Sequence, residues 1–362
     1  MPRESTTSLR RGWTTGACAA AAARAAFAAL LSGQFPDPVS IRLPRGGLAR
    51  FQLVLAERCE ASARAGILKD AGDDPDITHG ALVIAEVAPA PLGSGIGFAA
   101  GKGVGTVTRA GLALAVGEPA INPGPRAMIR DALTDEADEY GASLPDVTVT
   151  ISIPGGERLA EKTMNARLGI IGGLSILGTT GIVIPYSCSS WIHSIQRGID
   201  VARAAGLDHI AAATGSTSER AVQQLYALPD HALIDMGDFV GGVLKYLRTH
   251  PIDRLTIAGG FAKLTKLADG HLDLHSARAA VDSTVLAQRL AALGADPNTV
   301  EAAAQAQGAG EVLTIAGDWR PALADDVARR AREVALATLG GKTAIEVAVV
   351  DRHGSFIARV GG

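Results

Sequence analysis

The sequence predicts an α/β protein, with an N-terminal α+β domain built on a mixed or antiparallel sheet and a Rossmann-like domain built on a parallel sheet. The chain of 362 residues is long enough for about two domains. Residues 147–153 alternate apolar and hydroxyl side chains, which is typical of a half-buried strand. After residue 208 an apolar run, a glycine-bearing loop and a helix repeat in order, which is typical of right-handed βαβ units.

The composition describes a folded and nearly neutral chain. Hydrophobic residues make up 47%, and 34 Lys+Arg against 37 Asp+Glu leave a net charge of −3. A large core can therefore be buried, and a protein that coats nucleic acid or an anionic membrane is not expected. The 43 glycines indicate many tight turns and close backbone approaches. Three scattered cysteines favour a reducing compartment, so we expect a cytoplasmic protein.

The first domain is expected to cover residues 1–160 and to begin with a helix. The alanine-rich run Ala17–Leu31 predicts this helix, with Thr14 or Thr15 as its N-cap and Gly33 at its end. Paired arginines before an apolar run also resemble an export signal. Arg24 in the middle of the run argues against that reading.

The rest of the first domain is expected to be rich in strands. The predicted elements are strands at 39–43, 48–56, 80–88 and 147–153, a helix at 125–140 and a glycine-rich loop at 91–105. Backbone N–H groups of such a loop can approach an anion or a nucleotide. A small-molecule phosphotransferase that uses this loop is therefore one alternative function.

The second domain is expected to cover residues 161–362. Apolar runs at 208–214, 232–235 and 254–258 predict parallel strands, and ligands of such sheets bind beyond the carboxyl ends of the strands. Helices at 283–293 and 321–339 and a hairpin of 343–350 with 355–360 complete the chain. As an alternative, this hairpin returns to the first domain.

Residues 168–192 carry no Asp, Glu, Lys, Arg or His, and by length they could span a bilayer. Several glycines and Pro185 interrupt the run, and these residues are costly in a helix. We therefore expect a buried strand-and-loop region and no membrane span.

Residues 69–80 concentrate charged side chains. Four aspartates fall within seven residues, between a lysine and a histidine. A solvated turn and a functional site fit this composition equally well.

Further along, His271, Asp273 and His275 would share one face of an extended segment. A fourth ligand is not evident nearby, so a structural or substrate-contacting role is favoured over a metal site.

Several motifs, read in order, closely resemble the cobalt-precorrin-5B C(1)-methyltransferase family of the CbiD type. The motifs are residues 11–18, 69–76, 117–123, 165–170, 175–181 and 274–276. The resemblance covers nearly the whole chain. Ala17 departs from the family pattern, which has threonine there, and Gly124 and Tyr186 are also atypical.

The resemblance implies methyl transfer from S-adenosyl-L-methionine to C-1 of cobalt-precorrin-5B. The product would be cobalt-precorrin-6A, an intermediate of anaerobic cobalamin (vitamin B12) biosynthesis. The macrocycle carries many carboxylate arms, so basic residues must meet them, and arginine suits paired carboxylate contacts best. The cobalt would arrive inside the substrate, so no protein-bound metal is expected.

The matching motifs and the predicted strand ends supply candidate site residues. Asp70 and His79 are the candidate catalytic residues, because either could shuttle a proton. The parallel-sheet half is expected to bind the methyl donor through Gly172, Gly173, Gly178, Thr179, Thr180, Gly181, Gly215, Ser216, Asp235 and Asp238. The expected substrate-binding residues are Arg10, Arg11, Thr14, Thr15, Lys69, Asp73, Asp74, Asp76, Arg167 and His275.

The expected partner is a small-molecule cobalt-corrin precursor, with no nucleic acid and no membrane. A homo-oligomer is left open. A non-catalytic protein that carries a tetrapyrrole is the second alternative function, beside the phosphotransferase.

Overall fold

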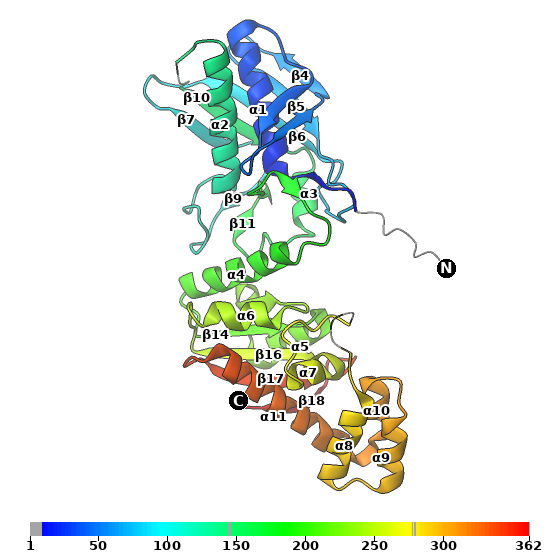
Figure 1. Cartoon of the computed structure of the whole chain (residues 1–362). Coiled ribbons are helices and arrows are strands. Elements are labelled where there is room, and N and C mark those ends of the chain that lie inside the picture. The colour runs from blue at the N-terminus through cyan, green and yellow to red at the C-terminus, as the bar shows by residue number, and fades with distance from the viewer. Residues whose placement is uncertain (1–8, 144–145, 277, 279, 362) are drawn as a thin grey trace, which may run out of the picture. The chain divides into compact units, whose positions relative to one another are not determined.

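The computed structural model describes residues 9–143, 146–276, 278 and 280–361. The chain divides into two compact units, Met1–Ser187 (unit 1) and Cys188–Gly362 (unit 2), shown in Figure 1. The division falls after residue 187 rather than at the expected position of 160. Three short strands explain the difference, because each pairs with an earlier strand of unit 1. They are β11 (Ile170–Ile171), β12 (Gly173–Leu174) and β13 (Ile182–Val183).

Unit 1 is built on a five-stranded sheet. Its order is β4 (Leu55–Arg58), β5 (Ala63–Leu68), β6 (Leu82–Pro89), β10 (Val147–Ser152) and β7 (Ile96–Ala100). Strand β10 runs antiparallel to β6 and parallel to β7, so the sheet is mixed. The valines and isoleucine of β10 are buried while its hydroxyl residues are half-buried, as the alternation predicted.

Helix α1 (Thr15–Ser32) packs on β5 and β6 beside α2 (Pro123–Glu139), and Figure 1 shows the two helices side by side. The N-cap Thr14 and the C-cap Gly33 confirm the predicted helix bounds. Small alanine side chains let the neighbouring elements approach closely. Within the described part of the chain, α1 is the one helix long and apolar enough to cross a membrane, and 83% of it is buried in the protein.

Smaller elements complete unit 1. They are β1 (Gly12–Trp13), which pairs with β13, the hairpin of β2 (Val39–Arg42) and β3 (Leu48–Phe51), β8 (Gly103–Val104), β9 (Thr106–Val107) and α3 (Gly156–Ala160). The region 91–105 therefore contains strands β7 and β8 rather than one long loop.

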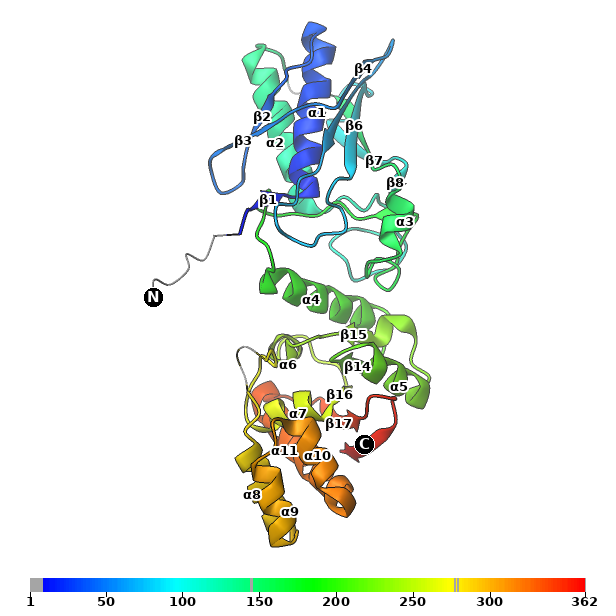
Figure 2. The ribbon, with the colours of Figure 1, turned by 90° about the vertical axis from the view of Figure 1, so that its right-hand side faces the viewer.

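Unit 2 contains a second five-stranded sheet, seen in Figure 2. Its order is β15 (Leu233–Asp235), β14 (His209–Ala213), β16 (Arg254–Gly260), β17 (Ala344–Val350) and β18 (Phe356–Val360). The first four strands are parallel and β18 is antiparallel. The predicted parallel strands and the C-terminal hairpin are thus present, and the hairpin stays in the sheet of unit 2.

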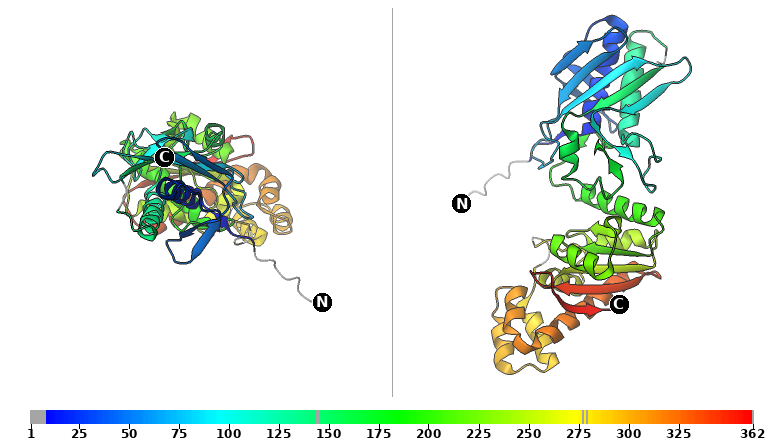
Figure 3. Two further views of the ribbon diagram at one scale, coloured as in Figure 1. Left: turned by 90° about the horizontal axis from the view of Figure 1, so that it is seen from above. Right: turned by 180° about the vertical axis from the view of Figure 1, so that it is seen from behind.

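Helices cover both faces of this sheet, because alternate strand residues enter different cores. Ala211 and Ala213 pack with Val222 of α5, whereas Ile210 and Ala212 join the larger core on the other face. The helices, which Figure 3 shows from two further sides, are α4 (Cys188–Ala204), α5 (Ser216–Tyr226), α6 (Val240–Leu247), α7 (Phe261–Ala268), α8 (Ser283–Leu293), α9 (Pro297–Ala304), α10 (Ala309–Ile315) and α11 (Arg320–Leu339), with short 3₁₀ turns at Asp230–Ala232 and Gly317–Trp319. Helix α4 begins inside the run 168–192, so the expected strand-and-loop region ends earlier than predicted.

Candidate functional site

Three segments far apart in the sequence meet in unit 1: residues 10–16, 69–80 and 177–186. We call them the three-segment cluster. The N–H of Trp13 donates to the carbonyl of Asp70 at 2.7 Å, and the N–H of Gly16 donates to the carbonyl of Leu177 at 2.9 Å. Pairing of β1 with β13 adds further backbone contacts. The structure therefore brings together three of the motifs that the sequence singled out.

Glycines permit this close approach at Gly72 and Gly178. Gly72 has a φ of +69°, and a Cβ there would lie 2.6 Å from the carbonyl carbon of Arg11. Gly178 has a φ of +120° and lies against the side chain of Thr14. Left-handed backbone and missing space together exclude other residues at both positions. These glycines hold the cluster together.

Thr14 and Thr15 have structural roles. The Thr14 hydroxyl accepts the N–H of Ala17 at 3.2 Å and caps α1. The side chain of Thr15 is buried. The expectation that Thr15 contacts substrate is therefore corrected, because its burial leaves no surface for a ligand, and Thr14 is occupied as a helix cap.

Asp70 forms a two-pronged ion pair with Arg10, in which Nη2 lies 2.9 Å from Oδ1. Its Oδ1 also accepts the N–H of Gly72 at 2.9 Å. These hydrogen bonds, led by that of Arg10, lower the pKa of Asp70 to about 2. A carboxylate with so low a pKa is a weak base, which argues against the expected proton-shuttle role for Asp70.

His79 is the other expected catalytic residue, and it lies beside Asp70. Its Nδ1 accepts the N–H of Ala71 at 3.1 Å and lies 3.8 Å from Asp70 Oδ1. The neutral ring therefore carries its proton on Nε2. Because the side chain is exposed, this N–H is available to a ligand.

Lys69 is buried, with 1% of its side chain exposed, and its Nζ lies 2.6 Å from Oδ2 of Asp76. Burial opposes ionisation of Asp76, but the hydrogen bonds from Lys69 and Thr78 outweigh it and hold the pKa of Asp76 below its usual value. A buried, paired ammonium cannot meet the carboxylate arms of a macrocycle. The expected substrate-binding role of Lys69 is therefore corrected to a structural one.

We call residues 69–80 the acidic loop. Its remaining aspartates also bind protein groups. Asp73 Oδ2 accepts the N–H of Arg10 at 2.6 Å, and Asp74 Oδ1 accepts the N–H of Tyr186 at 2.9 Å. The acidic loop thus contains exposed turns, but its carboxylates bind protein groups. Its carboxylates tie together the three segments, which leaves them poorly suited to bind the substrate directly.

The expected cationic residues differ in their surroundings. Arg11 is exposed and makes no hydrogen bond or ion pair with the residues that the structure describes. Arg167 is half-buried in the turn before β11. His275 lies in unit 2, where its N–H donates to Asp273 Oδ1 at 3.1 Å. Among these, Arg11 is best placed to meet an anionic ligand in unit 1.

The expected methyl-donor residues divide between the units. Those of unit 1 are Gly172, Gly173, Gly178, Thr179, Thr180 and Gly181, and those of unit 2 are Gly215, Ser216, Asp235 and Asp238. The assignment of the first group to the parallel-sheet half is wrong, because β12, β13 and their connection pair within unit 1.

The carboxyl ends of β14 and β16 form the edge where ligands of parallel sheets bind. The chain passes from β14 to β15 on one side and then to β16 on the other, so the strand order reverses between β14 and β16. Gly215 precedes α5 and Gly260 precedes α7, and a Cβ on either would meet no atom within 4 Å. The backbone at this edge is therefore open to close approach by a ligand.

Two further groups lie at the carboxyl end of β15. Asp238 forms an ion pair with Lys263, and the exposed Trp191 donates its Nε1–H to the carbonyl of Asp235 at 3.1 Å. The sequence analysis missed Trp191, because its contact depends on the fold of α4 against β15. Asp238 was expected to bind the methyl donor, but its carboxylate is already paired with Lys263, which weakens that expectation.

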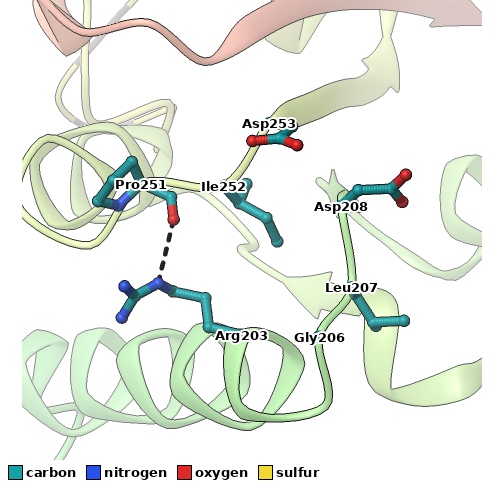
Figure 4. Close-up of a pocket in the computed structure, with 7 residues that line it drawn as sticks. All are labelled: Arg203, Gly206, Leu207, Asp208, Pro251, Ile252 and Asp253. Carbon is teal, nitrogen blue, oxygen red and sulfur yellow. Dashed lines mark hydrogen bonds between the residues drawn. The ribbon is translucent and has the colours of Figure 1, made fainter.

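A cavity of about 280 Å³ lies at the opposite end of the sheet. As Figure 4 shows, its lining comes from the end of α4 and from the residues that precede β14 and β16. Arg203 donates to the carbonyl of Pro251 there at 3.1 Å. This cavity is therefore separate from the edge at which the sequence places the ligand.

The glycine-rich region 91–105 uses its amides internally. The N–H groups of Gly93 and Gly95 donate to the carboxylate of Asp146 at 2.8 and 2.6 Å. These bonds hold the pKa of Asp146 below its usual value. The amides that a phosphotransferase would offer to a phosphate are thus occupied by a side chain of the same unit.

Arg109 is a second residue that the sequence analysis missed. A Cβ on Gly169 would lie 2.5 to 2.8 Å from the side chain of Arg109, so glycine is required there. The Nη1 atom of Arg109 is buried and has no hydrogen-bond partner among the described residues. No local pattern marks Arg109, because the contact joins segments 60 positions apart.

Among the residues that the structure describes, no group of three or more His, Cys, Asp or Glu could hold a metal ion.

Comparison with known proteins gives consistent matches. Residues 2–185 match the CbiD family model, and residues 273–361 match that of the CbiD C-terminal domain. Relatives from Brucella canis and Brucella suis, both named cobalt-precorrin-5B C(1)-methyltransferase, are 60% identical over 97% of this chain and 96% of their own. A crystal structure of the cobalamin biosynthesis protein cbiD from Archaeoglobus fulgidus is 29% identical, covering 70% of this chain and 77% of that one, with a TM-score of 0.39.

Proposed function

This chain belongs to the CbiD family, and on that premise we propose that it methylates C-1 of cobalt-precorrin-5B with S-adenosyl-L-methionine. The product is cobalt-precorrin-6A, in anaerobic cobalamin biosynthesis. The observation that carries the proposal is the 60% identity, over 97% of the chain, to relatives named for this reaction. The free cysteines Cys18, Cys59 and Cys188 support a reducing location, and we place the reaction in the cytoplasm.

The donor is proposed to bind at the Rossmann-like edge of unit 2. Gly215 and Gly260 leave the backbone open where the strand order reverses. Helix α5 begins at Ser216, so its first N–H groups lie at this edge. S-adenosyl-L-methionine supplies an electrophilic methyl group on a cationic sulfur. A site that holds this cation too tightly would slow transfer, so the ion pair of Asp238 with Lys263 suits the task by neutralising a nearby carboxylate.

The macrocycle is proposed to meet the three-segment cluster. Arg11 is exposed and makes no ion pair with the described residues, so it can pair with a carboxylate arm, and His79 of the same cluster offers an N–H. The structural pairs around Asp70 and Lys69 hold this surface rigid. Methyl transfer requires C-1 in line with the methyl and the sulfur, and orientation of this kind supplies much of the rate of such reactions.

The test is an anaerobic incubation with methyl-labelled S-adenosyl-L-methionine and cobalt-precorrin-5B. Label is expected in the macrocycle, with one S-adenosylhomocysteine formed for each methyl transferred. A parallel reaction with Mg²⁺ and ATP is expected to show no phosphoryl transfer. Binding of the macrocycle without S-adenosylhomocysteine would instead support a carrier protein and refute the proposal.

A further inference from the structure

Tyr186 adopts a backbone conformation that is unusual for a bulky residue. Its φ is +56°, and among the described non-glycine residues only Tyr186 and Ala227 have a positive φ. Such a conformation costs energy and persists where surrounding contacts impose it. The contacts that impose it therefore show what the position is built for.

The acidic loop holds Tyr186 in place. Asp74 Oδ1 accepts its N–H at 2.9 Å, while the adjacent Asp73 accepts the N–H of Arg10 at 2.6 Å. The preceding Pro185 is buried and anchors the segment. The position of Tyr186 is thus coupled to that of the cationic segment that contains Arg10 and Arg11.

The side chain of Tyr186 is exposed. It is 68% exposed, and its hydroxyl makes no hydrogen bond with the described residues. Ile184 and Leu177, on the same segment, are 55% and 56% exposed. This segment pairs with the one that contains the exposed Arg11, because Gly12 is the partner of Val183, so the surface offers exposed apolar groups together with a guanidinium.

This combination selects one class of occupant. A flat macrocycle with carboxylate arms offers apolar ring surface to Tyr186 and Ile184 and negative charge to Arg11. A protein partner of ordinary composition would need more than this small patch to bind stably.

We propose that Tyr186 is a substrate-binding residue whose aromatic ring packs against the macrocycle while Arg11 pairs with one of its carboxylate arms. The inference rests on the proposed function. The aromatic face carries the contact, so the hydroxyl is dispensable.

Binding measurements on the full-length protein test this role. Absorbance titration gives the Kd for cobalt-precorrin-5B, and a separate titration gives the Kd for S-adenosyl-L-methionine. Tyr186→Asn is the informative variant, because asparagine tolerates the left-handed backbone and the protein should fold. The Kd for the macrocycle is expected to rise about tenfold while that for the donor is unchanged.

Two further variants sharpen the result. Tyr186→Phe is expected to bind the macrocycle like the wild type, because the ring is retained. Tyr140→Ala removes another exposed tyrosine of unit 1, outside the three-segment cluster, and serves as the matched control with no expected change.

Three results would overturn the inference. These are unchanged macrocycle affinity in Tyr186→Asn, equal loss of affinity for donor and macrocycle, or a change only in sedimentation, which would mark a contact between copies. The titrations need no turnover, so they remain informative if methyl transfer is absent. Failure of the proposed function and failure of this inference are therefore distinguishable.

Discussion

Lys69 and Asp76 show how burial decides the meaning of charged residues in a motif. The sequence predicted that Lys69 meets the substrate, whereas the structure buries it against Asp76. No local pattern could reveal this, because the burial depends on segments far apart in the sequence that meet around residues 69–80. The family resemblance includes this motif, but the role of its individual side chains depends on the fold.

Substitution Lys69→Met is expected to destabilise unit 1 by about 3 kcal/mol, because it leaves the Asp76 carboxylate without its partner. Urea unfolding followed by circular dichroism measures the change. Arg42→Met is the control, since Arg42 is an exposed partner of Asp135 and its loss should cost less than about 1 kcal/mol. Equal effects of the two substitutions would contradict the structural role of Lys69.

Asp70 gives a prediction about pH. Its pKa is lowered to about 2 in the folded protein, against about 4 for an ordinary aspartate. A lowered pKa stabilises the fold above the ordinary value, and this stability is lost as the pH falls from about 4 toward 2. The difference in unfolding free energy between wild type and Asp70→Asn should therefore shrink below about pH 4. A difference that is independent of pH would refute the account of this ion pair.

Elements with strong local signals were predicted well, and those that depend on tertiary contacts were not. The first helix has a threonine N-cap and a glycine C-cap, and the structure places it at Thr15–Ser32. Strand β5 was missed because alanines and a glycine weaken its pattern. Helix α4 was missed, because its first residues, 188–192, end an uncharged run that the sequence analysis assigned to strands and loops.

The edge of the unit 2 sheet carries a prediction about the methyl donor. Gly215 is extended and a Cβ there meets no protein atom, so Gly215→Val should fold normally while its side chain blocks a ligand. The Kd for S-adenosyl-L-methionine, measured by calorimetry, is expected to rise at least about tenfold. Gly308 is an equally open, extended glycine that precedes α10, and Gly308→Val is the matched control. Similar Kd values for both variants would place the donor elsewhere.

At the scale of the whole molecule, the largest hydrophobic core of each unit is made of residues of that unit alone. The sequence predicted two domains but placed the boundary at 160. Strands β11 to β13 are only two residues long and pair with segments far away in the sequence, so no local signal assigns them to unit 1. The same reason explains why the glycines at 172–181 were assigned to the wrong half.

Hydrogen exchange tests this division. If residues 170–183 belong to unit 1, the destabilising variant Lys69→Met should speed exchange in them as it does in β10. Exchange in β16 of unit 2 should not change, because its core is separate. Mass spectrometry of peptides resolves these regions. Faster exchange in β16 together with unchanged exchange at 170–183 would contradict the assignment.

The central claim is methyl transfer to one defined carbon. The most direct test is an anaerobic reaction of the full-length protein with cobalt-precorrin-5B and S-adenosyl-L-methionine that carries a ¹³C-methyl group, followed by NMR of the isolated macrocycle. The account predicts one new ¹³C-methyl signal, on C-1 of the macrocycle. Label at another position, or none in the macrocycle when the substrate is competent, would contradict it.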